Sequence, residues 1–325
     1  MPNHPTNLRQ QQAVGPQAHR CTVLAPATVA NLVCGFDVLG MCLNEPNDVM
    51  EVRLLSEKKV TIDDTGGYNL PSDPAANTAG APLLAMLEEI GKPIGFNISI
   101  QKLIKPGSGI GSSAASAAGA VVAANHLLGN PFTKEDLVRF AMIGEKVASG
   151  VKHADNIAPC IYGGITLIRS IFPLDIVTIP FPALQITVVH PQIEVRTSDA
   201  RQILRKEVLL KDAIRQWGNI GGLVAGLMKN DYELISRSLE DVIIEPVRSM
   251  LIPGFDEVKQ QCRKAGALGG GISGSGPSIF MLSRELETAK KVELIMQGIY
   301  ERIGLPFNTY VTTVNSSGVQ IIGGQ

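Results

Sequence analysis

The sequence predicts a two-lobed protein that combines helices and strands, and three observations support this prediction. At 325 residues, the chain exceeds the length at which a single hydrophobic core usually keeps growing. Expected strands and helices alternate along it. In one expected strand, Phe96, Ile98 and Ile100 alternate with polar residues, so one of its faces is polar. Strands of a doubly wound parallel sheet instead read as continuous apolar runs, which argues against that class.

Residues 21–179 are expected to hold six strands and three helices. Residues 1–20 are rich in Asn, Gln and Pro, and we expect a flexible leader outside the fold. The expected strands cover residues 21–24, 49–55, 60–62, 96–101, 164–168 and 176–179. The expected helices cover residues 75–90, 112–128 and 133–148. Pro74 precedes the first helix, and Thr133 with Asp136 caps the third.

The second half is expected to form the other lobe. The Pro-rich stretch Phe172–Pro182 is the candidate boundary, which gives lobes at residues 21–171 and 172–325. Helices are expected at residues 198–210, 214–228, 233–239, 255–265 and 285–303. Strands are expected at residues 185–189, 278–282, 308–314 and 319–322.

Composition restricts the partners. Hydrophobic residues make up 45% and charged residues 18% of the chain, enough for a large core. A net charge of −1 gives no overall attraction to nucleic acid or to an anionic membrane. The five cysteines include no CxxC pair, which favours reduced thiols over disulfides or a zinc site. We find no signal peptide or membrane-spanning run and expect a cytoplasmic protein.

The most informative stretch is the glycine-rich segment Pro106–Ser116. Gly107, Gly109 and Gly111 alternate and lead into an Ala-rich helix. Such glycines let the backbone come close to a ligand, and the first turn of the helix offers free N–H groups that suit a phosphate. An ordinary Gly/Ser helix entry remains the alternative for this motif alone. No Lys follows the glycines as in a Walker A loop, and Ser112 stands where a dinucleotide motif needs its third glycine.

The phosphate-loop segment resembles the PxGxGLGSSAA motif of the GHMP kinase family, with Ile110 in place of Leu. Ala25–Asp37 resembles the first motif of that family and Gly271–Ser278 its third, in the expected order. The likeness runs from about Thr22 to the C-terminus. It implies two α+β lobes, with a left-handed βαβ crossover in the N-terminal lobe and a ferredoxin-like C-terminal lobe.

The resemblance implies ATP and Mg²⁺ as cofactors. Glu145 and Ser113 would hold the metal, and Asn77 would touch the adenine. ATP would lie on Pro106, Gly107, Ser108, Gly109, Ile110, Gly111, Ser112, Ser113, Ala114, Ala115 and Ser116. Magnesium suits a site with few carboxylates plus nucleotide phosphates. The segment Gly269–Pro277 would pack against the phosphate loop.

Several segments resemble the branch of the family that phosphorylates homoserine, among them Gly35–Gly40, His153–Pro159 and Ile244–Arg248. The mevalonate branch has an Asp seven residues before the glycine pair that corresponds to Gly163-Gly164, whereas this chain has Asn156. An amide can orient a hydroxyl but cannot take its proton. The resemblance therefore implies catalysis without a side-chain base, with Asn156 positioning the nucleophile. Asp155 is the alternative base, although we favour a carboxylate satisfied by backbone N–H groups.

L-homoserine is therefore the expected substrate, and its binding residues follow from the resemblance. Its carboxylate would be held by Arg201 and Arg248, and its ammonium by Asn31 and Asp37. His153 and Thr197 would line the same pocket, with Thr197 near the reacting groups. Taken singly, each residue also fits an ordinary structural role; Arg248, for example, could pair with Glu245. A homodimer is compatible with these expectations.

Two other functions stay open on the sequence. Another GHMP kinase of the mevalonate type would also need a cation for a carboxylate. A non-catalytic nucleotide-binding protein on this fold would be expected to lack Glu145 or the Ser112-Ser113 pair, and both are present. A nicotinamide oxidoreductase is disfavoured by the spacing of the glycines.

Overall fold

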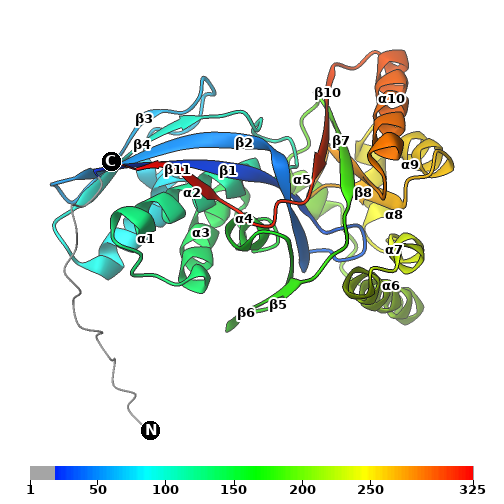
Figure 1. The fold of residues 1–325 in the computed structure, drawn as a ribbon, viewed down its shortest axis with the longest axis horizontal. Coiled ribbons are helices and arrows are strands. Elements are labelled where there is room, and N and C mark those ends of the chain that lie inside the picture. The colour runs from blue at the N-terminus through cyan, green and yellow to red at the C-terminus, as the bar shows by residue number, and fades with distance from the viewer. Residues whose placement is uncertain (1–18, 325) are drawn as a thin grey trace, which may run out of the picture.

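The computed structural model describes residues 19–324. Residues 1–18 of the expected leader lie outside this range, and Arg20 begins the first strand. The described chain forms two sheets side by side along the longest axis of the molecule, each with its own layer of helices (Figure 1). None of the helices in residues 19–324 combines the length and the apolar character needed to cross a lipid bilayer.

The first sheet has seven strands. Its order is β11-β1-β2-β4-β3, with β5 paired to β2 and β6 paired to β5. The strands are β1 (Arg20–Ala30), β2 (Leu39–Leu55), β3 (Val60–Asp64), β4 (Gly95–Gln101), β5 (Ile165–Ile171), β6 (Leu174–Ile179) and β11 (Gln320–Gly324). In β4, the apolar residues of the predicted alternation are buried and the polar ones are partly exposed.

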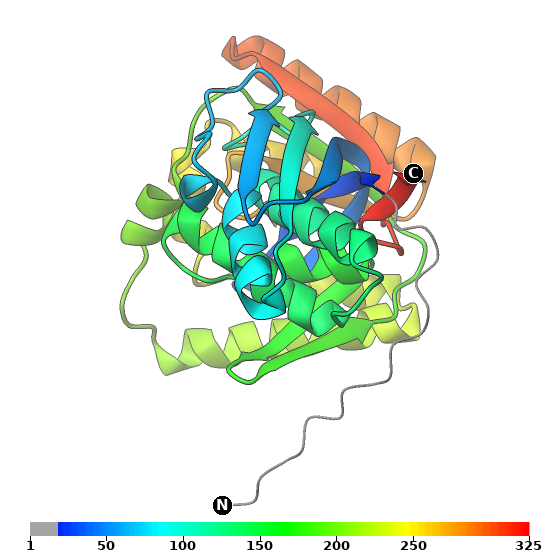
Figure 2. The same cartoon turned by 90° about the vertical axis from the view of Figure 1, so that its left-hand side faces the viewer.

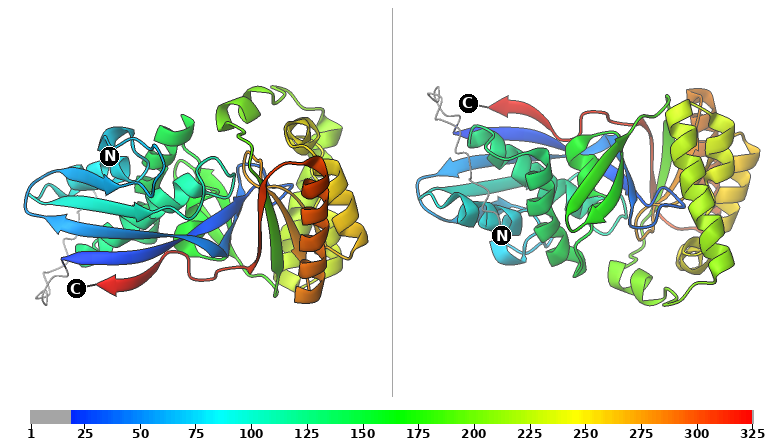
Figure 3. Two further views of the ribbon diagram at one scale, coloured as in Figure 1. Left: turned by 90° about the horizontal axis from the view of Figure 1, so that it is seen from above. Right: turned by 90° about the horizontal axis from the view of Figure 1, so that it is seen from below.

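One face of this sheet is covered by helices. They are α1 (Gly80–Ile90), α2 (Ser112–Leu127), α3 (Lys134–Ser149) and α4 (Ile157–Tyr162). Figures 1 and 2 show them below the strands, and Figure 3 shows the open face of the sheet from above. The central helix α2 packs on β1 and β2. Its small side chains permit a close approach, since a Cβ on Gly119 would lie 3.1 Å from the side chain of Ala25.

Strands β3 and β4 are the only parallel neighbours among the paired strands of residues 19–324. Helix α1 lies between them in sequence, so the three elements form a βαβ unit. This is the type of unit that the family resemblance implies, and the left hand of its crossover stays a prediction.

The second sheet is antiparallel with the order β10-β7-β9-β8. Its strands are β7 (Gln185–Pro191), β8 (Gly269–Ile272), β9 (Ile279–Ser283) and β10 (Phe307–Thr313). Its helices are α5 (Thr197–Gln202), α6 (Leu210–Lys229), α7 (Tyr232–Ser238), α8 (Glu245–Arg248), α9 (Phe255–Lys264) and α10 (Leu286–Ile303). Numbered along the chain, the strands lie in the order 4-1-3-2 with helices after the first and third, which is the expected ferredoxin-like arrangement.

The boundary at residue 172 needs correction. Strand β6 lies beyond it but forms an antiparallel hairpin with β5, so its hydrogen bonds keep it in the first sheet. The chain changes sheets between β6 and β7. Strand β11, also expected in the second lobe, returns to pair with β1.

Two expected helices are interrupted. The helix predicted for residues 75–90 is a 3₁₀ turn at Pro74–Ala76 followed by α1, because Asn77 Oδ1 accepts hydrogen bonds from the backbone of Ala79 and Gly80. The helix predicted for residues 198–210 ends at Gln202, and α6 begins only at Leu210.

Four short elements were not predicted: α4, α8, β8 and the 3₁₀ turn Ser249–Leu251. Helices α4 and α8 are too short to give a periodic pattern. Strand β8 is mostly glycine, which usually indicates a loop. Its pairing with β9 is so close that a Cβ on Gly270 would lie 1.9 Å from the carbonyl oxygen of Phe280.

Candidate active site

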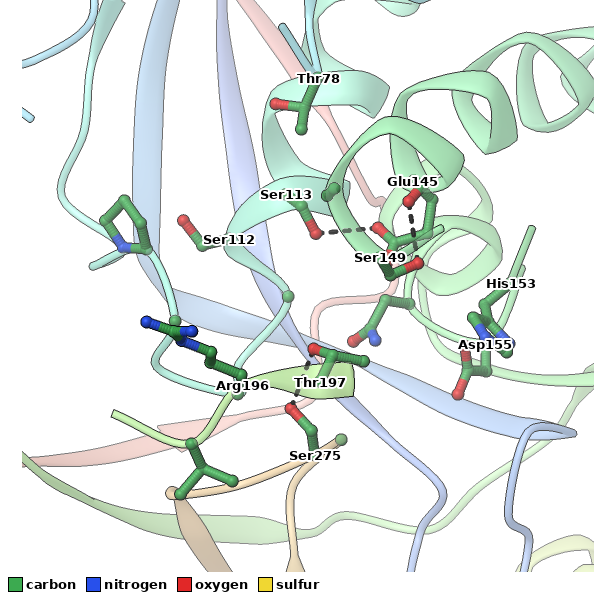
Figure 4. Close-up of a pocket in the computed structure, with 18 of the residues that line it drawn as sticks. Thr78, Ser112, Ser113, Glu145, Ser149, His153, Asp155, Arg196, Thr197 and Ser275 are labelled. Atoms are coloured by element: carbon green, nitrogen blue, oxygen red, sulfur yellow. Dashed lines mark hydrogen bonds between the residues drawn. The ribbon is translucent and has the colours of Figure 1, made fainter. Parts of the chain in front are cut away.

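A cavity of about 290 Å³ lies between the two halves of the molecule. The phosphate loop and the ends of α2 and α3 form one side, and the segment before α5 faces them (Figure 4). Its lining includes most of the predicted site residues: Asn31, Asp37, Pro106, Gly107, Gly109, Gly111, Ser112, Ser113, Ser116, Glu145, His153, Asn156, Thr197, Arg201 and Arg248. The structure therefore brings together residues from six separate parts of the sequence.

The three loop glycines have the backbone conformation that the motif requires. Their φ angles are +75° at Gly107, +81° at Gly109 and +73° at Gly111, in the left-handed region that favours glycine. No protein atom lies within 4 Å of a Cβ placed on Gly107. The loop leads directly into the N-terminus of α2, where free N–H groups suit an anion. These features fit the triphosphate of ATP.

The other loop residues serve mainly through their backbone. Ser108, Ile110, Ala114 and Ala115 are buried in the protein interior and are not among the lining residues. The Ser112 hydroxyl donates to the carbonyl oxygen of Ile104 at 2.8 Å, so it holds the loop in place. Of the two helix-start serines, Ser113 has the hydroxyl directed at a carboxylate.

The third motif packs against the phosphate loop, as expected. Ser273 Oγ donates to the carbonyl oxygen of Gly109 at 2.8 Å, and Ser278 Oγ donates to that of Ser108 at 2.6 Å. A Cβ on Gly109 would lie 2.5 Å from the carbonyl oxygen of Gly276. These contacts join the two halves of the molecule at the loop.

Glu145 lies on α3, which packs against α2, the helix that follows the phosphate loop. Its Oε2 accepts a hydrogen bond of 2.8 Å from Ser113 Oγ, and the Ser149 hydroxyl lies beside it (Figure 4). Burial raises the pKa of this carboxyl group, while the hydroxyls of Ser113 and Ser149 lower it. The Ser149 hydroxyl also donates to the backbone carbonyl oxygen of Glu145 at 2.9 Å. No Lys or Arg of residues 19–324 forms an ion pair with it. A half-buried carboxylate without a counter-charge in the described chain, beside a hydroxyl and a phosphate loop, fits the donor set of Mg²⁺.

A buried ion pair between Lys102 and Asp48, which the sequence analysis did not predict, supports the phosphate loop. Lys102 Nζ contacts Asp48 Oδ2 and also donates to the carbonyl oxygen of Ser112 at 3.0 Å and to Ser116 Oγ at 3.1 Å. Asp48 Oδ1 accepts from the backbone N–H groups of Leu103 and Ile104. Burial lowers the pKa of Lys102 and the nearby Asp48 raises it. The pair therefore fixes both ends of the loop that carries the glycines.

Asn156 is held by a residue of the first motif. Thr28 Oγ1 donates to Asn156 Oδ1 at 2.7 Å, and Asn156 is the residue before α4. The threonine itself is aligned by its backbone N–H, which donates to the carbonyl oxygen of Ile110. With its oxygen engaged, the Asn156 amide has its NH₂ group left to donate to a ligand.

The neighbouring Asp155 is buried, and its pKa is raised from 3.8 to about 7. Burial is the main cause, and the negative charges of Asp37 and Glu145 add to it. Hydrogen bonds from the backbone N–H groups of Asp155 and Asn156 act in the opposite direction. The nearby backbone N–H groups thus favour the charged form of Asp155, while its pKa of about 7 is one at which a general base can act.

Asp37, Arg201 and His153 form a compact charged group. Arg201 Nη2 donates to Asp37 Oδ1 at 2.9 Å, to Oδ2 at 3.0 Å, and to His153 Nε2 at 3.0 Å. Burial lowers the pKa of His153, Asp37 raises it, and the two arginines lower it further. A neutral imidazole that accepts at Nε2 agrees with this arrangement. Arg201 is therefore not a solvated helix residue.

Arg248 is 3% exposed and has no carboxylate partner in the described chain. Its Nε donates to the carbonyl oxygen of Ala200 at 3.0 Å, and its Nη1 donates to that of Gly274 at 3.1 Å. The alternative partner Glu245 contacts Lys259 instead. Burial lowers the pKa of Arg248 to about 10, and the charge of Arg201 contributes in the same direction.

The remaining predicted pocket residues are tied to the loops around the cavity. Asn31 has a left-handed backbone, with φ at +75°, and its side chain joins Gly274 O to the N–H of Asp37. Thr197 Oγ1 lies 3.3 Å from Ser275 Oγ, so α5 and the third motif meet at the cavity (Figure 4).

The structure gives Asn77 a different role from the predicted adenine contact. Its side chain is buried, donates to the carbonyl oxygen of Pro71 at 2.7 Å, and accepts from the start of α1. Asn77 does not line the cavity, whereas the adjacent Thr78 does. Its amide is used to shape the turn, so we no longer assign it to ATP.

Other lining residues were missed by the sequence analysis. Phe36, Lys102, Arg196 and Ser275 all face the cavity. Phe36 lies in the first family motif and Ser275 in the third, and these motifs were the sequence signal that could have identified them. Nothing in the local sequence distinguished Lys102 or Arg196 from solvated surface cations.

Comparisons with known proteins identify the family of the chain. The family model described as "GHMP kinases N terminal domain" matches residues 77–164, and "GHMP kinases C terminal" matches residues 223–302. The first match contains the phosphate loop, Glu145 and Asn156, and the second contains Arg248 and the third motif.

Whole-length relatives give a more specific match. The chain is 47% identical to a homoserine kinase of Chloroherpeton thalassium over 93% of this chain and 99% of the relative. It is 47% identical to one of Chlorobaculum tepidum, over 93% and 98% respectively. The crystal structure of homoserine kinase from Cytophaga hutchinsonii superposes with a TM-score of 0.92 at 49% identity, covering 96% of this chain and 100% of the other.

Proposed function

The chain belongs to the GHMP kinase family, and on that premise we propose that it is an ATP-dependent kinase of L-homoserine. The product is O-phospho-L-homoserine, on the route to threonine. The name shared by the relatives of similar length supports this substrate.

The observation that carries the substrate assignment is the buried, unpaired guanidinium of Arg248 next to the acidic Asp37. A buried cation whose hydrogen bonds go only to carbonyl oxygens favours an anionic ligand group. Asp37 and the Asn31 oxygen offer acceptors for an ammonium in the same region. Both charges together suit an α-amino acid better than mevalonate, which has a carboxylate but no ammonium.

The reaction is a direct transfer between two bound substrates. The homoserine hydroxyl oxygen forms a bond to the γ-phosphorus of ATP, the bond from that phosphorus to ADP breaks, and the hydroxyl proton is released. The glycine loop and the start of α2 hold the triphosphate. Asn156, aligned by Thr28, orients the hydroxyl. Thr197 and Ser275 border the position where the two substrates meet.

Glu145 and Ser113 are the residues that would hold Mg²⁺. When bound, the metal neutralises negative charge on the phosphates. The role of Glu145 itself is to supply a fixed negative charge close to the loop, held in place by the Ser113 hydroxyl.

A coupled ADP-release assay with homoserine, mevalonate, galactose and shikimate tests this proposal. We expect homoserine to give the highest kcat/KM, with phosphohomoserine formed in equal amount to ADP. A higher kcat/KM for mevalonate would favour the mevalonate-type alternative. ATP binding without ADP release in the presence of any of these alcohols would favour a non-catalytic nucleotide-binding protein.

A further inference from the structure

The ring of Phe36 contacts both arginines of the substrate pocket. The guanidinium carbon of Arg248 lies 4.8 Å from the centre of its ring, and that of Arg201 lies 5.4 Å from it. Both distances are within the range of a cation–π contact, in which the negative face of the ring attracts the cation. One aromatic ring thus contacts both residues to which we assign the carboxylate.

These contacts matter because the two guanidinium groups repel each other. The charge of Arg201 contributes to the lowered pKa of Arg248, and Arg248 is buried. Arg201 has Asp37 as a counter-charge, whereas the other partners of Arg248 are two carbonyl oxygens. Asp37 and His153 interact electrostatically with both cations, and the Phe36 ring is the aromatic side chain that contacts both of them.

A ring suits this position better than a carboxylate. A second acidic side chain would neutralise the arginines, and it would compete with an anionic ligand for their N–H groups. A ring face stabilises the cations without occupying those donors. The arginines are then kept together and still able to bind a carboxylate.

The geometry points to Phe36 as a positioning residue for substrate recognition: its ring holds Arg201 and Arg248 in place for the substrate carboxylate. This inference rests on the proposed function, since it requires a substrate that carries a carboxylate. It assigns Phe36 no contact with the reacting atoms. The main alternative is that the ring only forms an apolar wall against the carbon chain of the substrate.

The substitution Phe36→Leu separates these roles, because it keeps apolar volume and removes the ring face. We expect the KM for homoserine to rise about tenfold, from two cation–π contacts in a partly desolvated site, with kcat and the KM for ATP within about twofold of wild type. The matched control is Phe181→Leu. Phe181 is also half-buried, but it packs in the core and does not line the cavity. The KM of Phe181→Leu for homoserine should therefore stay at the wild-type value.

The second arm uses 3-amino-1-propanol, which is homoserine without its carboxylate. Its kcat/KM should be the same in wild type and Phe36→Leu, because the arginines have no carboxylate to hold. If its turnover is too slow, its Ki as a competitive inhibitor against homoserine gives the same ratio. An equal loss for both compounds would identify Phe36 as an apolar wall and overturn the proposal.

The third arm replaces Phe36 with 3,4,5-trifluorophenylalanine at this single position. Fluorination weakens the negative ring face but changes the shape little, and a cavity of about 10 Å³ borders the ring and gives it some room. We expect a rise in the homoserine KM between wild type and Phe36→Leu. A wild-type KM in the fluorinated protein would contradict the cation–π role.

The two proposals fail in different ways. If wild type does not phosphorylate homoserine, the proposed function is wrong. If wild type does so and Phe36→Leu has an unchanged homoserine KM, the proposed function stands and the role of Phe36 is wrong.

Discussion

The Thr28 hydroxyl donates a 2.7 Å hydrogen bond to the side-chain oxygen of Asn156, 128 positions along the chain. This bond joins the first motif to the residue that we assign to the nucleophile. It also fixes which end of the amide faces the cavity, since an engaged oxygen leaves the NH₂ group as donor. The Asn156 NH₂ group can then donate a hydrogen bond to the substrate hydroxyl oxygen, but the amide cannot accept the hydroxyl proton.

Replacing Asn156 should therefore disturb the alignment of the substrate hydroxyl with the γ-phosphate of ATP. We expect Asn156→Ala to lower kcat by up to roughly a hundredfold, because a misplaced nucleophile reacts slowly. Asn156→Asp should also lower kcat, since a carboxylate near the phosphates adds repulsion and cannot donate a hydrogen bond when ionised. Steady-state kinetics with homoserine measures both. An Asn156→Asp enzyme faster than wild type would show that a base is useful at this position.

Asp155 provides the test of the alternative mechanism. If it is not a base, Asp155→Asn should keep most of its kcat, and the kcat–pH profile of wild type should show no ionisation near 7 that the variant lacks. If it is the base, kcat of wild type should fall below about pH 7, where the carboxyl group is protonated. A folded Asp155→Asn protein that binds both substrates but has no turnover would rule out our assignment.

The raised pKa of Asp155 also affects stability. The folded protein holds a proton on Asp155 up to about pH 7, whereas the unfolded chain releases it near 3.8. The contribution of this group to stability therefore falls as pH rises from about 4 to 7, and then stays constant. At about 1.36 kcal/mol for each pKa unit, the upper limit is about 4 kcal/mol. Asp155→Asn should thus raise Tm more at pH 8 than at pH 5.

Arg248 should be sensitive even to a conservative change. We expect Arg248→Lys to lower kcat/KM for homoserine, because an ammonium cannot reproduce the planar fork of a guanidinium. The loss should correspond to an increase in activation free energy on the order of 2–4 kcal/mol. The KM for ATP should be unchanged. Arg139→Lys is the matched control, since Arg139 lies on the exposed surface and pairs with Glu89 there. A homoserine kcat/KM within about threefold of wild type, or about 0.65 kcal/mol, would contradict the carboxylate assignment.

Glu145→Gln should lower kcat far more than it raises the homoserine KM. Glutamine keeps the shape and the contact with Ser113 but removes the negative charge that would hold Mg²⁺. Titration of activity with Mg²⁺ should show a higher requirement in the variant. Full activity of Glu145→Gln at low Mg²⁺ would exclude this role.

The buried pair of Lys102 and Asp48 should be required for stability. Lys102→Met leaves a buried carboxylate with only two backbone partners, which we expect to cost about 3–5 kcal/mol. The double variant Asp48→Asn/Lys102→Met should recover part of that loss, because the uncompensated charge is gone. Thermal unfolding of the two single variants and the double variant measures the coupling. Additive losses would mean that the two charges do not depend on each other.

Features that depend on neighbouring residues were predictable from the sequence. The alternation in β4, the Thr133–Asp136 capping box of α3 and the entry from the glycine loop into α2 all agree with the structure. The interruption of the helix predicted for residues 75–90 depended on hydrogen bonds to one side chain, that of Asn77. Helix propensity does not report such bonds.

Contacts between distant residues were not predictable from local pattern. Arg201 and Asp37 are 164 positions apart, and Lys102 and Asp48 are 54 apart. Family resemblance, rather than periodicity, pointed to Arg201 and Asp37 as separate substrate contacts, and it did not predict that they form an ion pair. The second pair lies outside the quoted motifs. Burial decides whether such charged residues are structural or solvated, and burial is a property of the completed fold.

The return of β11 to the first sheet determines how the chain can be divided. The polypeptide leaves that sheet after β6, builds the whole second sheet, and then pairs its last strand with β1 through Cys21–Leu24. A cut in the connection between β6 and β7 would therefore give two fragments, with the edge strand of the first sheet on the second fragment. The N-terminal fragment would expose the hydrogen-bonding edge of β1 and be prone to self-association. Co-expression of both fragments would supply that strand in trans, so recovery of activity from the two pieces would depend on strand β11.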